Sequence, residues 1–266
     1  MKTRIITGLI ALALLLPILW IGSWPLVVGT CVLGVIAISE FFMMKKKRFF
    51  SMTGLITSIS TVLIILPDEY RSFFPEGVGI WELYFVFAMM LVVMTVLSNN
   101  DFTFDDAGVF MLASLYIGSG FHYFVETANY GFMTIMFVLL IIWATDTGAY
   151  LFGMRFGKRK LAPVISPNKS VEGSLGGIVL AVVVALVMNH FLGLLEVSPG
   201  MMILLATLMS VVGQLGDLTE SAYKRYFGVK DSGKILPGHG GILDRFDSTL
   251  FVMPLFQIFL TIYQLN

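Results

Sequence analysis

Long apolar runs separated by short polar segments make up most of this chain. Most runs approach the length of about 20 residues that an α-helix needs to cross roughly 30 Å of hydrocarbon. They lack the alternation of a transmembrane β-barrel, and helices are the other structure that satisfies every backbone group in lipid. The pattern therefore predicts an all-α polytopic membrane protein with nine spans, at about 4–22, 25–44, 51–67, 79–98, 107–125, 131–152, 172–195, 201–220 and 248–264.

Composition supports this prediction. The chain is 57% hydrophobic and 13% charged, with a mean hydropathy of +0.89, which leaves too little polar surface for an ordinary soluble domain. The first run follows two basic residues, as in a secretory signal, but no A-x-A site follows it, so we expect a retained helix. No repeat or linker stands out, and a single domain over 1–266 is expected.

The distribution of charge predicts the orientation. If the N-terminus is cytoplasmic, 16 of the 17 Lys and Arg residues lie on the inner side and only Arg71 lies outside. The positive-inside rule favours this arrangement in a cell membrane. With nine spans Asn266 is external, and the polar segments 153–171 and 221–247 face the cytoplasm.

Several charged residues have simple structural interpretations. The basic run 45–48 is expected to anchor the topology and to contact anionic head groups. The acidic residues Asp101, Asp105 and Asp106 are expected in a solvated turn. Glu40, near the inner end of its span, is expected to snorkel or to form an ion pair.

The inner end of the eighth span carries the first candidate chemistry. If it is helical, Asp217, Ser221 and Lys224 share one face at i, i+4 and i+7, and Glu220 lies four residues before Lys224. An Asp at this depth is costly unless it is paired, hydrated or bound to a metal. The alternative is an ion pair of Lys224 with Asp217 or Glu220 that only ties the helix end.

The segment before the last span adds further carboxylates. Asp244 and Asp247 lie three residues apart around Arg245, so they can share one face of a helical turn. Together with Asp217 they can supply oxygen ligands to Mg²⁺. Asp231 is either a further ligand or a solvated loop residue.

Two more segments face the same predicted side. His239 lies between two glycines, which let a backbone approach an anion closely. Asp146 lies in the inner half of the sixth span, again a costly charge. In the loop that follows, Ser166 or Ser170 can cap the seventh helix and Glu172 suits its first turn. The residues placed where an anion could approach that helix are Asn168 and Lys169.

Taken together, these residues resemble the phosphatidate cytidylyltransferases, or CDP-diacylglycerol synthases. The family signature reads S-x-x-K-R-x4-K-D-x-[small]-x2-hydrophobic-[small or Pro]-x-H-G-G-x-x-D-R-x-D. The matching positions are Ser221, Lys224, Arg225, Lys230, Asp231, Gly233, Ile235 or Leu236, Pro237, His239, Gly240, Gly241, Asp244, Arg245 and Asp247. The segments TDTGAY at 145–150, SPNKSxEG at 166–173 and GQLGDLxES at 213–221 also resemble the family. The match covers the C-terminal half, roughly 131–266, which is the expected catalytic half.

The resemblance implies transfer of a cytidylyl group from CTP to phosphatidic acid, giving CDP-diacylglycerol and pyrophosphate for phospholipid synthesis. It implies one or two Mg²⁺ ions, with a second, monovalent ion left open, and the metal ligands Asp217, Asp244 and Asp247. The expected catalytic residues are Asp217, Ser221, Lys224, Arg225, Asp244, Arg245 and Asp247. The expected substrate-binding residues are Asp146, Asn168, Lys169, Lys230, Asp231, Lys234, His239, Gly240 and Gly241. The expected partners are CTP, phosphatidic acid, membrane lipids and, left open, a second copy of the chain.

Other functions fit the sequence less well. A CTP-dependent kinase of a lipid alcohol, such as the polyprenol kinases, is the nearest alternative. A transporter could use Asp146 and Asp217 as an ion relay, but the chain lacks the internal repeat of many transporters. The basic residues are divided among short loops, so no nucleic-acid role is expected.

Overall fold

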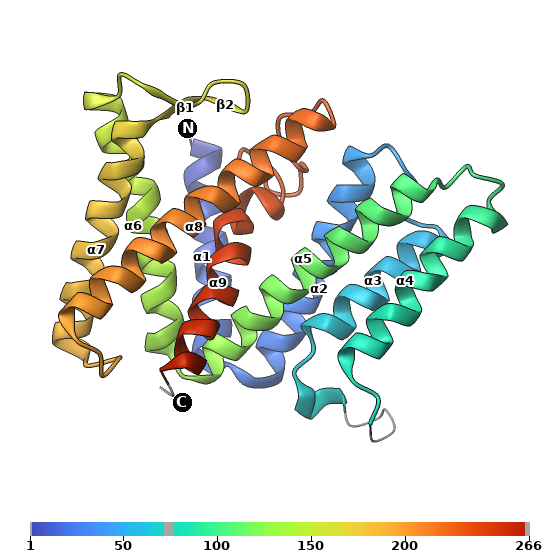
Figure 1. Ribbon diagram of the computed structural model, residues 1–266, viewed down its shortest axis with the longest axis horizontal. Coiled ribbons are helices and arrows are strands. Elements are labelled where there is room, and N and C mark those ends of the chain that lie inside the picture. Colours follow the sequence, from blue (N-terminus) through green and yellow to red (C-terminus); the bar gives the residue numbers. More distant parts are fainter. Residues whose placement is uncertain (1, 72–76, 264–266) are drawn as a thin grey trace. The chain divides into compact units, whose positions relative to one another are not determined.

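The computed structural model describes residues 2–71 and 77–263, and helices form almost all of their regular structure (Figure 1). The prediction of an all-α polytopic membrane protein is confirmed. Asn266, predicted to be external, lies outside the described residues. In chain order the elements are α1 (Lys2–Ile21), α2 (Ser23–Met44), α3 (Met52–Ile65), the 3-10 helix η1 (Asp68–Arg71), α4 (Ile80–Leu97), α5 (Phe104–Asn129), α6 (Phe132–Phe156), β1 (Lys160–Ala162), β2 (Ser166–Ser170), α7 (Val171–Leu192), α8 (Pro199–Tyr226) and α9 (Leu243–Ile262).

Each of the nine predicted runs corresponds to a helix, but their lengths differ. Within the described residues seven helices, α2 and α4 to α9, are long and apolar enough to cross a membrane. The 14 residues of α3 and the apolar part of α1 over Ile6–Ile21 are shorter. Helix α8 extends beyond its predicted apolar run to Tyr226, so the polar residues that follow the run are helical, which is the condition for Asp217, Ser221 and Lys224 to share one face.

Serine side chains mark the start of three helices, because a serine oxygen can accept one of the backbone N–H groups that lack a partner in the first turn. The oxygen of Ser51 accepts from Gly54 at the start of α3, and Ser198 does the same for Met201 at the start of α8. At the start of α7 the acceptor is Ser170, which takes the N–H of Gly173 at 3.1 Å. Of the two caps considered for this helix, Ser170 is the one formed.

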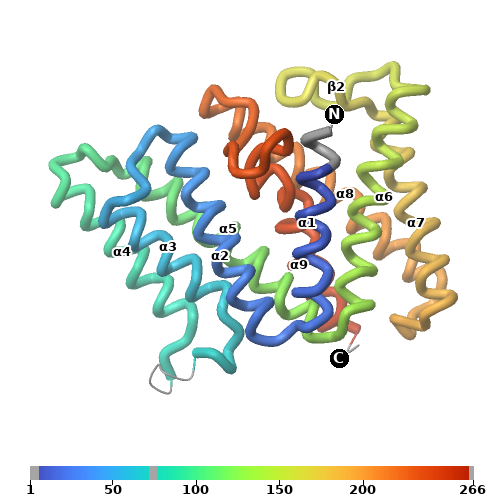
Figure 2. Tube along the Cα trace, turned by 180° about the vertical axis from the view of Figure 1, so that it is seen from behind, coloured from blue at the N-terminus to red at the C-terminus, as the bar shows by residue number. Residues whose placement is uncertain are grey.

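Contacts within the chain define two compact units. The first comprises Met1–Glu126 and Asp231–Arg245, and the second comprises Thr127–Lys230 and Phe246–Asn266. In the first unit α3 packs between α2 and α4, as both views show (Figures 1 and 2). Its core includes Phe42 of α2 and Phe110 of α5, whose rings stack with centroids 3.8 Å apart.

The first turn of α5 does not match its predicted environment. Asp106 is buried, and its carboxylate pairs with Lys45 at 2.6 Å and with Lys47 at 2.9 Å. It also accepts the N–H of Thr103, whose hydroxyl accepts the N–H of Asp106 in return. The expectation of a solvated acidic turn is therefore wrong for Asp106, because this reciprocal cap and the two lysines at the end of α2 satisfy the carboxylate.

In the second unit α6 and α7 pack with their backbones in close contact. A Cβ atom added at Gly148 of α6 would lie 2.7 Å from the carbonyl oxygen of Gly176, and one at Gly177 would lie 2.7 Å from that of Thr145. Glycine is therefore needed at both positions, since a larger residue would force the helices apart. This contact holds the start of α7 beside the C-terminal half of α6.

The segment between α6 and α7, predicted as a loop, contains a two-stranded antiparallel hairpin. Lys160 pairs with Ser170 and Ala162 pairs with Ser166. The carboxylate of Glu172, in the first turn of α7, accepts the backbone N–H of Lys158 and of Arg159. These short polar strands lack a buried alternating face, which explains why the apolar pattern did not indicate them.

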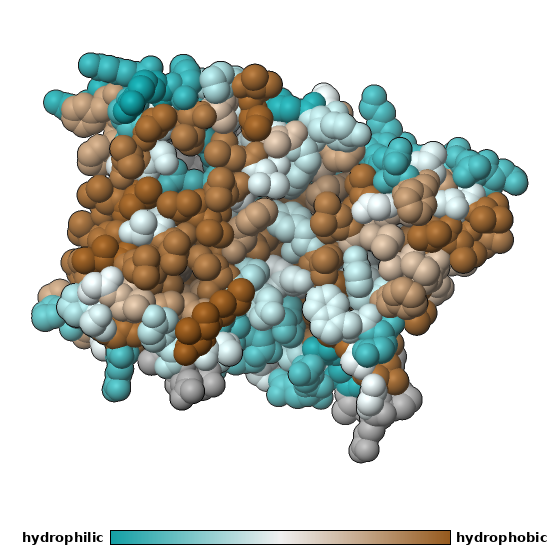
Figure 3. All heavy atoms as spheres, in the orientation of Figure 1, coloured by the Kyte–Doolittle hydropathy of each residue, from teal (hydrophilic) through white to brown (hydrophobic). Residues whose placement is uncertain are grey.

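The outer surface of the second unit suits a bilayer. On the face formed by α7 and α8, apolar residues cover the middle of the helices and polar residues gather at the end that carries the hairpin (Figure 3). On α7 the exposed apolar side chains recur every four residues, at Leu175, Val179, Val183 and Val187. A stripe of this kind is expected where a helix contacts lipid.

Candidate active site

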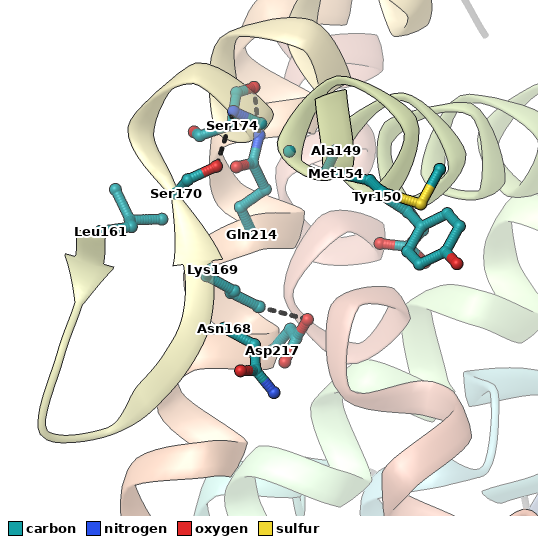
Figure 4. A pocket seen from close by; sticks show the side chains of 13 residues that line it. Ala149, Tyr150, Met154, Leu161, Asn168, Lys169, Ser170, Ser174, Gln214 and Asp217 are labelled. Carbon is teal, nitrogen blue, oxygen red and sulfur yellow. Dashed lines mark hydrogen bonds and ion pairs between the residues drawn. The ribbon is translucent and has the colours of Figure 1, made fainter. Parts of the chain in front are cut away.

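A pocket of about 520 Å³ lies within the second unit, where the β hairpin meets α6, α7 and α8 (Figure 4). Its volume is in the range of ordinary ligand sites. The pocket is lined by polar side chains from several elements and by apolar side chains of α6. The lining residues are Asp146, Ala149, Tyr150, Gly153, Met154, Leu161, Asn168, Lys169, Ser170, Gly173, Ser174, Gln214 and Asp217.

Local structure brings the polar residues of this pocket together. Strand β2 presents Asn168 and Lys169 immediately before the capped start of α7. Helix α8 contributes Gln214 and Asp217, three residues apart and so on neighbouring turns. The side-chain amide of Gln214 donates to the carbonyl oxygen of Ser174 at 3.3 Å, which links α8 to α7. Gln214 was not among the predicted site residues, although it lies in one of the segments that resemble the family.

The predicted site residues Lys169 and Asp217 form an ion pair in this pocket (Figure 4). The side chains are 28% and 30% exposed, so the pair is accessible to a ligand entering the pocket. The ion-pair partner of Asp217 in this pocket is therefore a lysine of the hairpin.

Lys224 instead pairs with Glu220 at 2.6 Å, which was the second alternative for this helix end. Both residues are buried in the second unit. Arg225, the next residue, is exposed, and its guanidinium donates to the carbonyl oxygen of Val229 at 3.0 Å. Ser221 is half-buried on the same helix. The catalytic roles expected for Ser221, Lys224 and Arg225 remain predictions.

Asp247 links three carboxylates of the second unit. Asp247 of α9 interacts electrostatically with Asp217 and with Asp146, and Lys224 provides an opposing positive charge. Like charges held together need cations, and carboxylate, amide and hydroxyl oxygens are the ligands that Mg²⁺ prefers. The donor set of the pocket therefore suits a hard divalent cation.

Among the residues that the structure describes, no three His, Cys, Asp or Glu side chains converge closely enough to hold a metal ion. The metal role of Asp217, Asp244 and Asp247 therefore remains a prediction. Asp244 and Asp247 both lie in the first turns of α9, so the helical turn that the sequence analysis considered for them is formed.

The remaining signature residues form a loop in the first unit. This signature loop, 231–242, precedes α9 and contains a tight turn in which Leu236 donates its N–H to the carbonyl oxygen of Gly240 at 3.0 Å. Gly238 and Gly240 have φ values of 78° and 85°, in the region that glycine adopts readily. Arg245 follows the loop and donates from Nε to the carbonyl oxygen of His239 at 3.0 Å.

Asp244 organises the signature loop. Its Oδ2 atom accepts three hydrogen bonds, from the N–H of Ser232 at 2.9 Å, from the hydroxyl of Ser232 at 2.9 Å and from the N–H of Gly241 at 2.8 Å. One carboxylate oxygen thus joins the two ends of the loop.

The predicted site residues are divided between the two units. Those in the second unit are Asp146, Asn168, Lys169, Asp217, Ser221, Lys224, Arg225, Lys230 and Asp247. Those in the first unit are Asp231, Lys234, His239, Gly240, Gly241, Asp244 and Arg245. In the signature loop Asp231 and Lys234 are exposed, and Lys230 just before it is exposed as well.

Glu40 is a site-related residue that sequence reasoning interpreted incorrectly. Its exposed fraction is 0%, and its carboxylate accepts hydrogen bonds from the signature loop, so the expectation of a snorkelling or ion-paired side chain is wrong. The available signal was its position within an apolar run, where a carboxylate is costly without specific partners. Those partners lie about 200 residues away along the chain, which no local pattern can indicate.

Comparison with known proteins connects this arrangement to one family. The sequence model of the cytidylyltransferase family matches residues 2–263. The phosphatidate cytidylyltransferase of Staphylococcus epidermidis is 47% identical over 262 residues, which cover 98% of this chain and 99% of the relative. That of Bacillus subtilis is 45% identical over 266 residues, covering 99% and 98%. That of Staphylococcus aureus is 46% identical over 264 residues, covering 98% and 99%.

These matches extend over both compact units, including the N-terminal helices, for which the sequence motifs alone indicated no relationship. The chain therefore belongs to the cytidylyltransferase family.

Proposed function

We propose that this protein is a membrane-embedded phosphatidate cytidylyltransferase, which transfers the cytidylyl group of CTP to phosphatidic acid and releases pyrophosphate. The relatives described above carry that name, and the match to each covers nearly its full length. The structural observation that supports it best is the pocket in which Lys169 pairs with Asp217 near two further carboxylates.

The chemistry asks mainly for alignment and charge neutralisation. The nucleophile is a phosphate monoester, whose second pKa is about 6, so it is largely a dianion near neutral pH. It can attack the α-phosphorus of CTP without a strong general base, and the bond to the β-phosphate oxygen breaks as pyrophosphate leaves. The site must therefore hold two polyanions in line and offset their charge.

The pocket residues have the chemistry for these tasks. Asp217, supported by Asp247 and Asp146, would hold one or two Mg²⁺ ions through carboxylate oxygens. A bound ion would neutralise phosphate charge and stabilise the leaving pyrophosphate. Lys169 already offers its ammonium group to an anion in this pocket, and it can bind a phosphate oxygen of the substrate instead of Asp217.

The apolar part of the pocket suits a lipid substrate. Tyr150 and Met154 of α6 line the pocket, and their side chains are exposed. In a bilayer this surface would adjoin hydrocarbon, so the phosphate of phosphatidic acid can reach Lys169 while its acyl chains stay in the membrane. CTP, which is soluble and highly charged, would enter from the aqueous side.

We also propose the finer topology. The chain crosses the cell membrane nine times, with α1 and the short α3 counted as spans, and the hairpin and the signature loop face the cytoplasm. The asymmetry of basic residues supports this orientation. CTP and phosphatidic acid can meet at that surface.

Product analysis tests the proposed reaction. Purified protein in mixed micelles with CTP, Mg²⁺ and phosphatidic acid should form CDP-diacylglycerol and an equal amount of pyrophosphate, detected by mass spectrometry and a coupled pyrophosphate assay. The matched control replaces phosphatidic acid with diacylglycerol of the same acyl chains, and it should give no product. Conversion of diacylglycerol to phosphatidic acid would instead identify a lipid-alcohol kinase.

A further inference from the structure

Glu40, in the last turns of α2, makes hydrogen bonds with both ends of the signature loop. Its Oε2 atom accepts the hydroxyl of Ser232 at 2.8 Å and the N–H of Leu243 at 3.0 Å. Its Oε1 atom accepts the N–H of Ile242 at 2.7 Å. Both oxygens of this fully buried carboxylate are thus used by residues 192 to 203 positions away.

These donors include backbone groups that a helix leaves without partners. Helix α9 begins at Leu243, so the N–H groups of Ile242 and Leu243 have no acceptor within the helix. A carboxylate at this end also interacts favourably with the helix dipole. Glu40 therefore caps the start of α9 from another helix, immediately before Asp244.

The signature loop fits closely around this carboxylate. A Cβ atom added at Gly233 would lie 2.7 Å from Oε1 of Glu40, and one added at Gly241 would collide with Oε1 and with the hydroxyl of Ser232. Neither position has room for a side chain. The two glycines let the loop backbone approach Glu40, and the carboxylate fixes where that backbone lies.

Ser232 connects Glu40 to Asp244. Its hydroxyl oxygen lies 2.8 Å from Oε2 of Glu40 and 2.9 Å from Oδ2 of Asp244. A serine hydroxyl carries a single hydrogen, so the two carboxylates share this one donor. A displacement of Glu40 would therefore change the hydrogen bonding of Asp244 directly.

We propose that Glu40 is a positioning residue of the cytidylyl-transfer reaction: it holds the signature loop and the first turn of α9 in the conformation that presents Asp244 and Arg245. Through Glu40 the N-terminal helices take part in the reaction, although the signature residues all lie in the C-terminal half. This role rests on the proposed function.

Helix α1 supports the loop at a second point. The hydroxyl of Thr7 donates to the carbonyl oxygen of Pro237 at 3.1 Å. A Cβ atom added at Gly8 would lie 3.6 Å from Nε2 of His239, so the imidazole lies against this helix. Two N-terminal helices thus contact the loop, α2 at its ends and α1 at its tight turn.

The test uses Glu40→Gln in the full-length protein. Glutamine keeps the size of the side chain but replaces one acceptor oxygen with an NH₂ group, and both oxygens of Glu40 accept backbone N–H groups. At least one of those hydrogen bonds is lost, whichever way the amide turns. The matched control is Thr30→Val in the same helix, since the buried Thr30 hydroxyl donates only to carbonyl oxygens of its own helix, those of Leu26 and Val27.

Two measurements follow the loop and the reaction separately. Loop conformation is read from the rate at which a maleimide labels Ile235→Cys, because Ile235 lies in the loop and is half exposed. The Cys31→Ala background removes the one cysteine of the natural chain, so only the introduced thiol reacts. The reaction is read as kcat and as KM for phosphatidic acid. We expect Glu40→Gln to lower kcat about ten- to a hundredfold, the factor for one lost charge-assisted hydrogen bond. Labelling should become faster, while the KM for phosphatidic acid stays near that of the wild type.

A Glu40→Gln protein with wild-type kcat and wild-type labelling would overturn the proposal. If that variant does not fold, Ser232→Ala decides, because it removes the shared hydroxyl and leaves both backbone hydrogen bonds of Glu40 in place. The proposal then predicts faster labelling and a kcat that is reduced severalfold, and unchanged values would overturn it. If the wild type forms no CDP-lipid, the proposed function fails, and the labelling rates still show whether Glu40 holds the loop.

Discussion

Two groups of carboxylates in this protein differ in how their charge is satisfied. In the first unit Glu40 and Asp244 accept N–H and O–H groups from the signature loop and the start of α9. In the second unit Asp217 pairs with a lysine side chain in an open pocket, and Asp247 experiences the charges of Asp217 and Asp146.

The difference separates fixed groups from exchangeable ones. Backbone N–H groups cannot move without rearranging the loop, so carboxylates that accept from them determine conformation. A lysine side chain can rotate away, so a carboxylate paired with it can exchange that partner for a metal ion or release the lysine to a phosphate. We therefore expect substitutions in the second unit to affect chemistry first, and substitution of Glu40 to affect chemistry through conformation. Asp244, which holds the loop and is also a predicted metal ligand, can combine both effects.

The largest effect is expected for Asp217→Asn, which removes the charge of the proposed metal ligand and the partner of Lys169. Loss of a ligand should remove several kcal/mol of transition-state stabilisation, or about a hundredfold to a thousandfold in kcat. CDP-diacylglycerol formation at saturating Mg²⁺ measures it. The matched control is Asp105→Asn, an exposed carboxylate in the first turn of α5, which should keep normal activity. Normal turnover by the Asp217 variant would exclude this residue as a ligand.

Substitutions of Asp244 distinguish its predicted role as a metal ligand from its role in holding the signature loop. Its three hydrogen bonds converge on one oxygen, so Asn can keep them through its carbonyl oxygen, whereas Ala loses them all. We expect Asp244→Asn to lower kcat about a hundredfold through loss of charge, with the labelling rate of Ile235→Cys unchanged. Asp244→Ala should also accelerate labelling. A fully active Asn variant would limit Asp244 to holding the loop.

A smaller effect is expected for Lys169→Met, which keeps the length of the side chain without its charge. Loss of one charge-assisted contact to phosphate should lower kcat/KM for CTP about tenfold or more. Lys160→Met serves as the control, because Lys160 is an exposed cation on the neighbouring strand. Equal activities of the two variants would mean that Lys169 does not bind substrate.

The smallest effect on activity is expected from cysteines that test the topology. Glu196 and Lys230 are exposed near opposite ends of α8, whose 28 residues span about 42 Å at 1.5 Å per residue. In a Cys31→Ala background and in intact cells, an impermeant thiol reagent should label Glu196→Cys, and it should label Lys230→Cys only after permeabilisation. The reverse pattern would place the pocket and the loop outside the cell.

Local patterns predicted the helices and part of the site. Apolar runs located the nine α-helices of the described residues, because a span in lipid needs continuous hydrophobicity. The condition under which Asp217 and Lys224 share a helix face is met, because α8 extends to Tyr226. Ser170 was one of two candidate caps because a serine before a helix has a specific chemical role there. The signature residues were identified because the sequence resembles the motif of a known family.

Partners that are distant in sequence could not be predicted in this way. The sequence analysis considered Lys224, on the same helix, as a partner of Asp217. The fold instead brings Lys169 of the hairpin to it. Asp106 looked solvated because its partners Lys45 and Lys47 lie about 60 residues earlier. The position of Glu40, a carboxylate within an apolar run, indicated that it needs specific hydrogen-bond partners. The donors that stabilise it lie near the other end of the chain, so the local pattern could not identify them.

The fate of a labelled phosphate tests the central claim most directly. Purified protein is incubated with phosphatidic acid, Mg²⁺ and CTP labelled at either the α- or the γ-phosphate, and the lipid and aqueous phases are separated. Cytidylyl transfer predicts that the α-label enters the lipid only when phosphatidic acid is present, and that the γ-label is recovered as pyrophosphate. Label entering the lipid from γ-labelled CTP, with CDP as the soluble product, would contradict the account and identify a kinase.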